Sequence, residues 1–236
     1  MHDKAKRRKR LLRLPTVENF SRNNWQRTDE TQLALSNLDK NPPPFSLGPV
    51  KKLCADVVLS KLTPSEIEDR IGRIRHPGAN RAAVEIIPEF LRFVGSHEIE
   101  GVPEFAEFKV TYPIGPNPDG GTLNVPVAPT FVCFLDGVLT PVFLIPWTKL
   151  AFSNFQKILM SSLIQDALLT HQDFLGCDAL VMAFPLIEET RQRYPVSWGV
   201  MSYALMDRER LNHQFLVYGR ALRNVLAALD EEPDTA

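Results

Sequence analysis

The sequence predicts an α/β protein whose mixed central sheet is flanked by helices, and three features support this fold class. Asp136-Gly137 joins two β-rich runs at residues 125–135 and 139–147, and both turn residues tolerate the positive φ of a two-residue hairpin. The long apolar segment 152–169 predicts a largely buried helix. Residues 177–184 form a nearly unbroken apolar run, which is typical of an inner strand. Hairpin strands followed by a helical crossover imply a mixed sheet.

The size and composition of the chain are those of an ordinary globular protein. Its 236 residues fit one sizeable domain, or one domain with extensions, and 44% of them are hydrophobic. No uninterrupted apolar run approaches the roughly 20 residues of a membrane helix, and the basic N-terminus lacks the apolar region of a secretory signal. The three cysteines are widely spaced and form no CxxC motif, so we expect buried, reduced thiols. A cytoplasmic protein without a membrane partner is therefore expected.

The charge pattern divides the chain into an arm, a domain and a tail. Residues 1–14 hold seven Lys or Arg against one Asp, a net of +6 in a chain whose net charge is −1. We expect residues 1–45 to be a basic, largely disordered arm with a Pro-rich spacer, residues 46–230 a single α/β domain, and residues 231–236 an acidic tail. Nucleic acid is a candidate partner of the arm, and the alternative is a solubilising terminus. The nucleic-acid-binding candidates are Lys6, Arg7, Arg8, Lys9 and Arg10.

Local signals place the elements that precede the hairpin. Thr63 is an N-cap, Pro64 suits the first helical position, and Glu66 completes a capping box. A second helix is predicted over residues 80–94, with Pro88 removing one hydrogen bond inside it. Residues 104–112 alternate well enough to predict a strand, and a turn-rich loop follows them.

The elements after the hairpin are also marked. Ser153 and Gln156 form a second capping box, which opens the buried helix. A further strand is predicted over residues 196–205. Asp207 then caps a final helix whose apolar positions face inward.

The resulting order of elements resembles the PD-(D/E)XK nuclease superfamily, the restriction-endonuclease-like fold. The core of that family is a helix, three antiparallel strands, a helix and a strand. The matching segments here are residues 80–94, 104–112, 125–135, 139–147, 153–169 and 178–184, which cover about half of the chain. The resemblance implies that the first three of these strands form a consecutive antiparallel meander, and that the last strand lies parallel to one of them.

The resemblance also implies a particular chemistry. In the family, acidic groups at the start of the second strand and the end of the third bind Mg²⁺, and a Lys two residues after the second acid lies by the attacking water. A Glu on the first helix often supplies another ligand. The metal lowers the pKa of the water and neutralises the charge that develops on the phosphate.

Matched residue by residue, this chain keeps only part of the motif. Glu85 falls at the position of the helix Glu, Lys149 at that of the Lys, and Pro129 at that of the motif Pro. The two strand acids are replaced by Thr130 and Trp147, neither of which can hold a hard divalent cation as a carboxylate does.

The first interpretation is therefore a non-catalytic protein of nuclease-like fold that acts in binding or assembly, with no cofactor or metal site and with nucleic acid as one candidate partner. Its candidate catalytic-position residues are Glu85 and Lys149. The first alternative is a Mg²⁺-dependent nuclease with relocated ligands, drawn from these two and from Asp136 and Asp166. The second alternative is an unrelated α/β fold that mediates protein–protein contacts.

Overall fold

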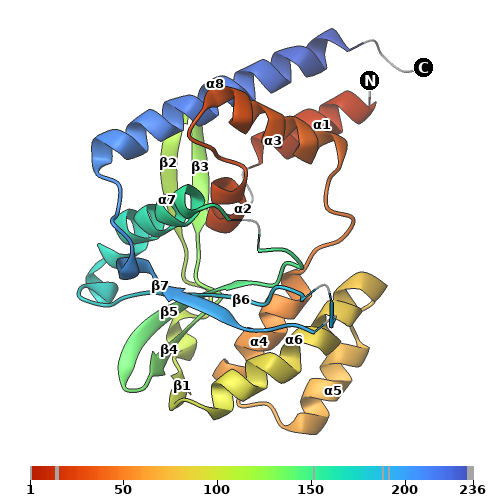
Figure 1. Cartoon of the computed structure of the whole chain (residues 1–236), viewed down its shortest axis with the longest axis vertical. Helices are drawn as coiled ribbons and strands as arrows, with labels where there is room; N and C mark the ends of the chain where they lie inside the picture. The colour runs from red at the N-terminus through yellow and green to blue at the C-terminus, as the bar shows by residue number, and fades with distance from the viewer. Residues whose placement is uncertain (1, 14–15, 151, 188, 191, 233–236) are drawn as a thin grey trace.

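The computed structural model describes residues 2–13, 16–150, 152–187, 189–190 and 192–232 (Figure 1). The helices are α1 (His2–Leu12), α2 (Val17–Arg22), α3 (Thr28–Lys40), α4 (Gly48–Leu59), α5 (Pro64–Gly72), α6 (Pro77–Gly95), α7 (Asn154–Ile164) and α8 (Arg208–Glu231). The strands are β1 (Ile99–Gly101), β2 (Val110–Pro116), β3 (Thr122–Val127), β4 (Phe131–Leu135), β5 (Val138–Ile145), β6 (Leu180–Ala183) and β7 (Val196–Gly199).

A mixed sheet forms the centre of the molecule. Among the described residues it has five strands in the order β1-β4-β5-β6-β7. β5 and β6 pair in parallel, and every other neighbouring pair is antiparallel. The register of the parallel pair places Val142 beside Leu180 and Ile145 beside Ala183, so both strands end at the same edge of the sheet.

Each face of this sheet buries a separate core. On one face, strand residues such as Phe131, Leu144 and Met182 pack against α4, α5 and α6. On the other face, residues such as Phe143 and Val181 pack against α7. Figure 1 shows the resulting three layers, with α4, α5 and α6 on one side of the sheet and α7 on the other. Alternating side chains of one strand therefore point into different cores.

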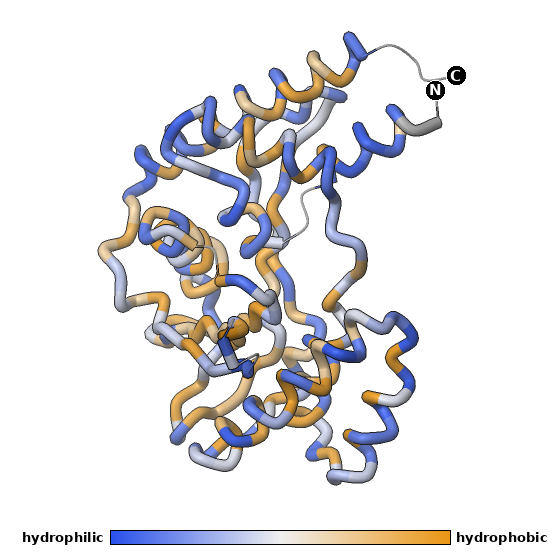
Figure 2. The backbone as a smooth tube through the Cα atoms, turned by 45° about the vertical axis from the view of Figure 1, so that its right-hand side comes forward, coloured by the Kyte–Doolittle hydropathy of each residue, from blue (hydrophilic) through white to orange (hydrophobic). Residues whose placement is uncertain are grey.

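A second, smaller assembly stands beside α7. β2 and β3 form an antiparallel ribbon outside the main sheet, and α1, α3 and α8 lie at its far end (Figure 1). Residues of the ribbon and of α8 belong to the same apolar cluster as the α7 face of the sheet. In Figure 2, hydrophilic and hydrophobic segments alternate along α8, as expected for a helix with one buried face.

Most of the strong local predictions are confirmed. Asp136 and Gly137 have φ values of 49° and 80°, and the turn they form joins β4 to β5 in an antiparallel hairpin. Both capping boxes are present, at Thr63 before α5 and at Ser153 before α7. Asp207 caps α8, and α6 continues through Pro88. The strand predicted at residues 178–184 is β6, and it lies parallel to β5 as expected.

The predicted three-strand meander is wrong in its first member. Residues 104–112 form a 3₁₀ turn at Pro103–Phe105 and then the beginning of ribbon strand β2, so they are not a strand of the main sheet. The short β1 takes the place beside β4, where Gly101 lets α4 approach closely: a Cβ at this glycine would lie 2.7 Å from the carbonyl oxygen of Val58.

The segment 125–135 also differs from its prediction, because it contributes to two strands and not to one. β3 belongs to the ribbon and β4 to the sheet, and the chain leaves one for the other at residues 128–130, which include Pro129. A proline has no backbone N–H to donate to a β-ladder, so it suits such a break.

Two further predictions differ from the structure. The strand predicted over residues 196–205 ends at Gly199 and is followed by a 3₁₀ turn. The helix α4 was not predicted.

The expectation of a largely disordered arm is contradicted for the described part of residues 1–45. This segment forms α1, α2 and α3, because its few apolar side chains are buried: Leu11, Val17, Phe20 and Leu35 all join the cluster that includes α8. The helices therefore pack across the domain boundary expected near residue 46. The predicted acidic tail lies mostly outside the described residues, which end at 232.

Two whole-chain expectations can be compared with the structure. Cys54 and Cys133 are buried free thiols, and burial raises the pKa of Cys133 to about 12. Cys177 is only partly buried. Within the described ranges, no helix has the length and apolar character needed to cross a bilayer.

Candidate functional site

A pocket of about 270 Å³ lies where β5 and β6 end. Pro146 and Thr148, which follow β5, line one side of it, and Glu85 and Arg81 of α6 line another. Ala82, Ala83, Ile86 and Ile87 bury one face of α6 against the sheet, and this packing directs Glu85 towards the sheet edge. The carboxyl edge of a parallel strand pair is a common place for a binding site in α/β proteins.

Arg193 fills the inner part of this pocket. Its side chain is only 4% exposed, although it comes from the segment between β6 and β7. The guanidinium donates from Nε to Glu85 at 3.0 Å, and from one terminal nitrogen to the carbonyl oxygens of Phe184 at 2.8 Å and Trp147 at 3.0 Å. One buried cation therefore links α6 to the ends of both parallel strands.

Glu85 is held as a carboxylate by two arginines. Arg81, one helical turn earlier, donates to its other oxygen at 2.8 Å. Partial burial raises the pKa of Glu85, but the hydrogen bonds and charges of Arg81 and Arg193 outweigh this effect, so the pKa lies below its ordinary value. The two guanidinium groups already offset the charge of this carboxylate, and their positive charge opposes the approach of a metal cation.

Trp147 stands at the motif position of an acid but faces away from Glu85. Its indole ring stacks on Phe152 with centroids 5.5 Å apart, and the guanidinium of Arg22 lies 4.7 Å from the ring centroid. It packs with the α7 side of the sheet, whereas Glu85 lies on α6 on the other side. A carboxylate placed at this position would therefore not lie on the same face as Glu85.

Thr130, at the other acid position, forms hydrogen bonds with the backbone of β5. Its hydroxyl oxygen accepts a hydrogen bond from the amide of Leu144 at 3.0 Å, and its own amide donates to the carbonyl of Val142 at 2.6 Å. Thr130 thus extends the β4–β5 ladder by one residue after Pro129 has interrupted it.

We expect Thr130→Val to destabilise the protein by about 1–2 kcal/mol, since it leaves the buried amide of Leu144 without an acceptor while keeping the side-chain shape. Thr130→Ser is the matched control, because it retains the hydroxyl and should cost much less. Urea denaturation followed by circular dichroism measures both variants. Equal stability of the valine and serine variants would show that this hydrogen bond contributes nothing.

The other predicted site residues are not brought together. Lys149 is exposed, four residues past the end of β5, and is not among the residues that line the pocket at Glu85. Asp136 sits in the β4–β5 turn and accepts a hydrogen bond from the amide of Glu98 at 2.9 Å. Asp166 lies in a π-helical turn after α7, where Tyr112 and Arg208 donate to it. In the described part of the chain, no three His, Cys, Asp or Glu residues are grouped so that they could hold a metal ion.

Sequence reasoning missed Arg193, the residue that defines the pocket. It follows Glu85 by 108 positions, and no spacing or motif connects the two. The isolated bridge between Leu186 and Arg193 turns the chain back towards the pocket, but the flanking residues carry no hairpin signal of the Asp-Gly kind.

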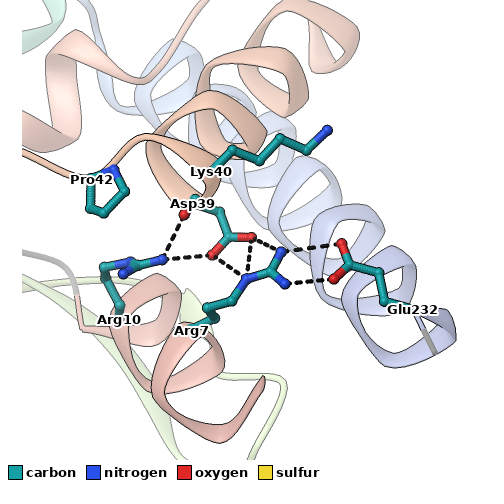
Figure 3. Close-up of a pocket in the computed structure, with 6 residues that line it drawn as sticks. All are labelled: Arg7, Arg10, Asp39, Lys40, Pro42 and Glu232. Carbon is teal, nitrogen blue, oxygen red and sulfur yellow. Dashed lines mark hydrogen bonds and ion pairs between the residues drawn. The ribbon is translucent and has the colours of Figure 1, made fainter. Parts of the chain in front are cut away.

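The five nucleic-acid-binding candidates lie on α1, and the three arginines among them pair with carboxylates of the same chain. Figure 3 shows Arg7 between Asp39 of α3 and Glu232, which follows α8, with both ion pairs at 2.5 Å. Arg10 donates to the side chain of Asp39 at 3.0 Å and to its carbonyl oxygen at 2.6 Å.

Arg8 makes a comparable pair of contacts on another side of α1. It binds Asp119, in the loop between β2 and β3, at 2.5 Å and Asp230 at 3.0 Å. Lys6 and Lys9 are exposed. The arginines of α1 therefore dock the N-terminal helix onto acidic groups of the same chain.

Fold and site together define a three-layer α/β protein whose pocket at the carboxyl edge of the sheet pairs a buried arginine with a partly buried glutamate. No family model and no curated protein matches this chain.

Proposed function

We propose that this protein is a non-catalytic relative of the restriction-endonuclease-like fold and that it acts by binding a partner. The observation that carries the proposal is the guanidinium of Arg193, which lies against Glu85, the pocket residue that stands at the helix-Glu position of the nuclease motif. A fixed internal cation neutralises the carboxylate permanently, whereas catalysis would need an ion that also contacts the phosphate and the attacking water.

The arrangement of the sheet supports the relationship. β4 and β5 form an antiparallel hairpin, α7 crosses over, and β6 returns parallel to β5, which is the second half of the core described for the nuclease family. β1 supplies a third antiparallel strand beside β4, after α6 has supplied the preceding helix. This order of elements supports the proposed relationship, and the pocket at the sheet edge holds an ion pair in place of a metal site.

Activity assays test the proposal directly. We expect the purified protein to leave plasmid DNA, single-stranded DNA and RNA intact in millimolar Mg²⁺ or Mn²⁺, because the strand positions that should bind the metal hold Thr130 and Trp147. Introducing Thr130→Asp and Trp147→Glu together should not create activity, since residue 147 faces the α7 side of the sheet.

The decisive control is Glu85→Gln, which is nearly isosteric. Metal-dependent cleavage by the parent protein that disappears in this variant would overturn the proposal and favour a nuclease with relocated ligands. Cleavage that persists unchanged in the variant would indicate a contaminating enzyme, and repurification through a second affinity tag would then remove it.

Nucleic acid is the second candidate partner, and the observation in its favour is the exposure of Lys6 and Lys9 on α1. Two exposed lysines contribute little by themselves to phosphate binding, and Arg7, Arg8 and Arg10 would first have to leave their carboxylates. A protein is therefore better supported than nucleic acid as the partner.

A further inference from the structure

A groove of about 640 Å³ lies on the outer side of the helical layer formed by α4, α5 and the beginning of α6. Leu53 and Ala79 are buried and form part of its floor, while Pro49 and Ile74 form part of its walls. Phe45 lines both this groove and the pocket at Glu85, so the groove lies beside that pocket but is built from other residues.

Phe45 is a fixed wall of the groove. Its ring stacks on His76, with centroids 4.5 Å apart and an angle of 23° between the planes. It also presses against the backbone at Gly78, where a Cβ would lie 2.4 Å from the ring. The groove therefore exists before any ligand arrives, which lowers the entropic cost of binding.

The rim of the groove is cationic. Lys52, Arg70, Arg73 and Arg75 line it against a single carboxylate, Asp56. Arg70 and Lys52 both bind Asp56 and thereby share one negative charge.

Of the remaining two arginines of the rim, one is held only by an exposed ion pair and the other is unpaired among the described residues. Arg73 pairs with Asp69 at 2.6 Å, but both side chains are largely exposed, so the pair is weak. Arg75 is exposed and has no hydrogen-bond or ion-pair partner in the described part of the chain. The excess positive charge around an apolar floor is complementary to a segment that is both acidic and apolar.

We propose that this groove docks an acidic segment of a partner protein and that an apolar side chain of the segment enters between Phe45 and Ile74. This assignment rests on the proposed function as a non-catalytic binding protein and names the chemistry of its partner. Carboxylates of the segment pair with Arg75 and Arg73, while the apolar anchor is buried against Leu53 and Ala79. Single-stranded nucleic acid fits less well, because base stacking needs an open aromatic face and the ring of Phe45 is occupied by His76 and Gly78.

Fluorescence anisotropy with three labelled probes tests the assignment. The first probe is a short peptide that alternates acidic residues with leucine, the second is the same peptide with serine in place of leucine, and the third is single-stranded DNA of equal charge. We expect the leucine peptide to bind about tenfold more tightly than either of the others, because only this peptide supplies both carboxylates and an apolar anchor.

The groove variant combines Arg73→Glu with Arg75→Glu, and the matched control combines Arg220→Glu with Arg223→Glu on the exposed side of α8. The groove variant should bind the leucine peptide at least about tenfold more weakly, whereas the control should bind as the parent does. Thermal melts establish that both are folded.

Three results would overturn the groove assignment: no binding of the leucine peptide, equal losses in both variants, or tighter binding of the DNA. If cleavage assays remain negative, each of these results leaves the non-catalytic reading intact. Metal-dependent cleavage that Glu85→Gln abolishes would instead contradict the proposed function itself.

Discussion

Replacing Arg193 with alanine should lower the free energy of unfolding by about 3 kcal/mol, the largest single-residue effect expected at the pocket. The substitution removes the buried cation from a partly buried carboxylate and leaves the carbonyl oxygens of Phe184 and Trp147 without their shared donor. It also removes the link between α6 and the ends of β5 and β6. Urea denaturation with linear extrapolation measures the effect.

Three matched variants separate the contributions. Arg81→Ala removes the exposed partner of Glu85 and should cost less than about 1 kcal/mol. Arg193→Lys keeps the charge but loses the planar fork, so its stability should fall between those of the parent and of Arg193→Ala. Glu85→Gln keeps the shape of the acceptor and should cost less than removing Arg193. If Arg193→Ala is no more damaging than Arg81→Ala, the buried link has no structural role.

Asp39→Ala should have the second-largest effect, a loss of about 2 kcal/mol together with release of α1. The Asp39 side chain is only 4% exposed and accepts hydrogen bonds from both Arg7 and Arg10 (Figure 3). Without it, two cations of α1 face each other with fewer carboxylates between them. Hydrogen exchange of residues 2–12 should accelerate more than exchange in α6.

The control for this prediction is Asp29→Ala. Asp29 also pairs with an arginine, Arg27, but both side chains are largely exposed, so no measurable change in stability or in α1 exchange is expected. Unchanged protection of α1 in Asp39→Ala would mean that the buried apolar residues alone hold the helix in place.

Acid provides an independent check on the same contact. Burial raises the pKa of Asp39, but hydrogen bonds from Arg7 and Arg10 outweigh it, and the pKa in the folded protein lies below its ordinary value. A lowered pKa means that the stabilisation is complete above about pH 4, near the pKa of an unfolded Asp, and is lost as the pH falls through the folded value. The stability difference between parent and Asp39→Ala should therefore be constant at neutral pH and shrink in acid.

Several elements of this protein are determined by the sequence near them. The capping boxes at Thr63 and Ser153 begin α5 and α7, and Asp136-Gly137 makes the hairpin turn. These signals depend on hydrogen bonds and dihedral angles within a few residues, so they can be recognised without knowing the rest of the fold. The apolar run that became β6 was equally clear, because a strand covered on both faces needs little polar surface.

Residues 99–112 show where local pattern fails. The alternation at residues 104–112 predicted a central strand, yet the three-residue β1 occupies that place and the alternating stretch begins the β2–β3 ribbon. An alternating pattern shows that a strand has two different faces, but it does not specify which neighbour the strand pairs with. In the folded chain β1 takes this place, and its Gly101 lies so close to α4 that a Cβ there would clash with the backbone of Val58.

The N-terminal helices and the pocket were decided by contacts between residues far apart in the chain. Charge and proline content suggested a disordered arm, but Asp39, Asp119, Asp230 and Glu232 receive its arginines, and α8 covers its few apolar residues. In the pocket, Glu85 could be predicted as a site residue from its position on a helix, whereas nothing in the sequence pointed to Arg193. Both arrangements depend on side chains that only the folded chain brings within hydrogen-bonding distance, and an ion pair across 108 positions leaves no periodicity in the sequence to detect.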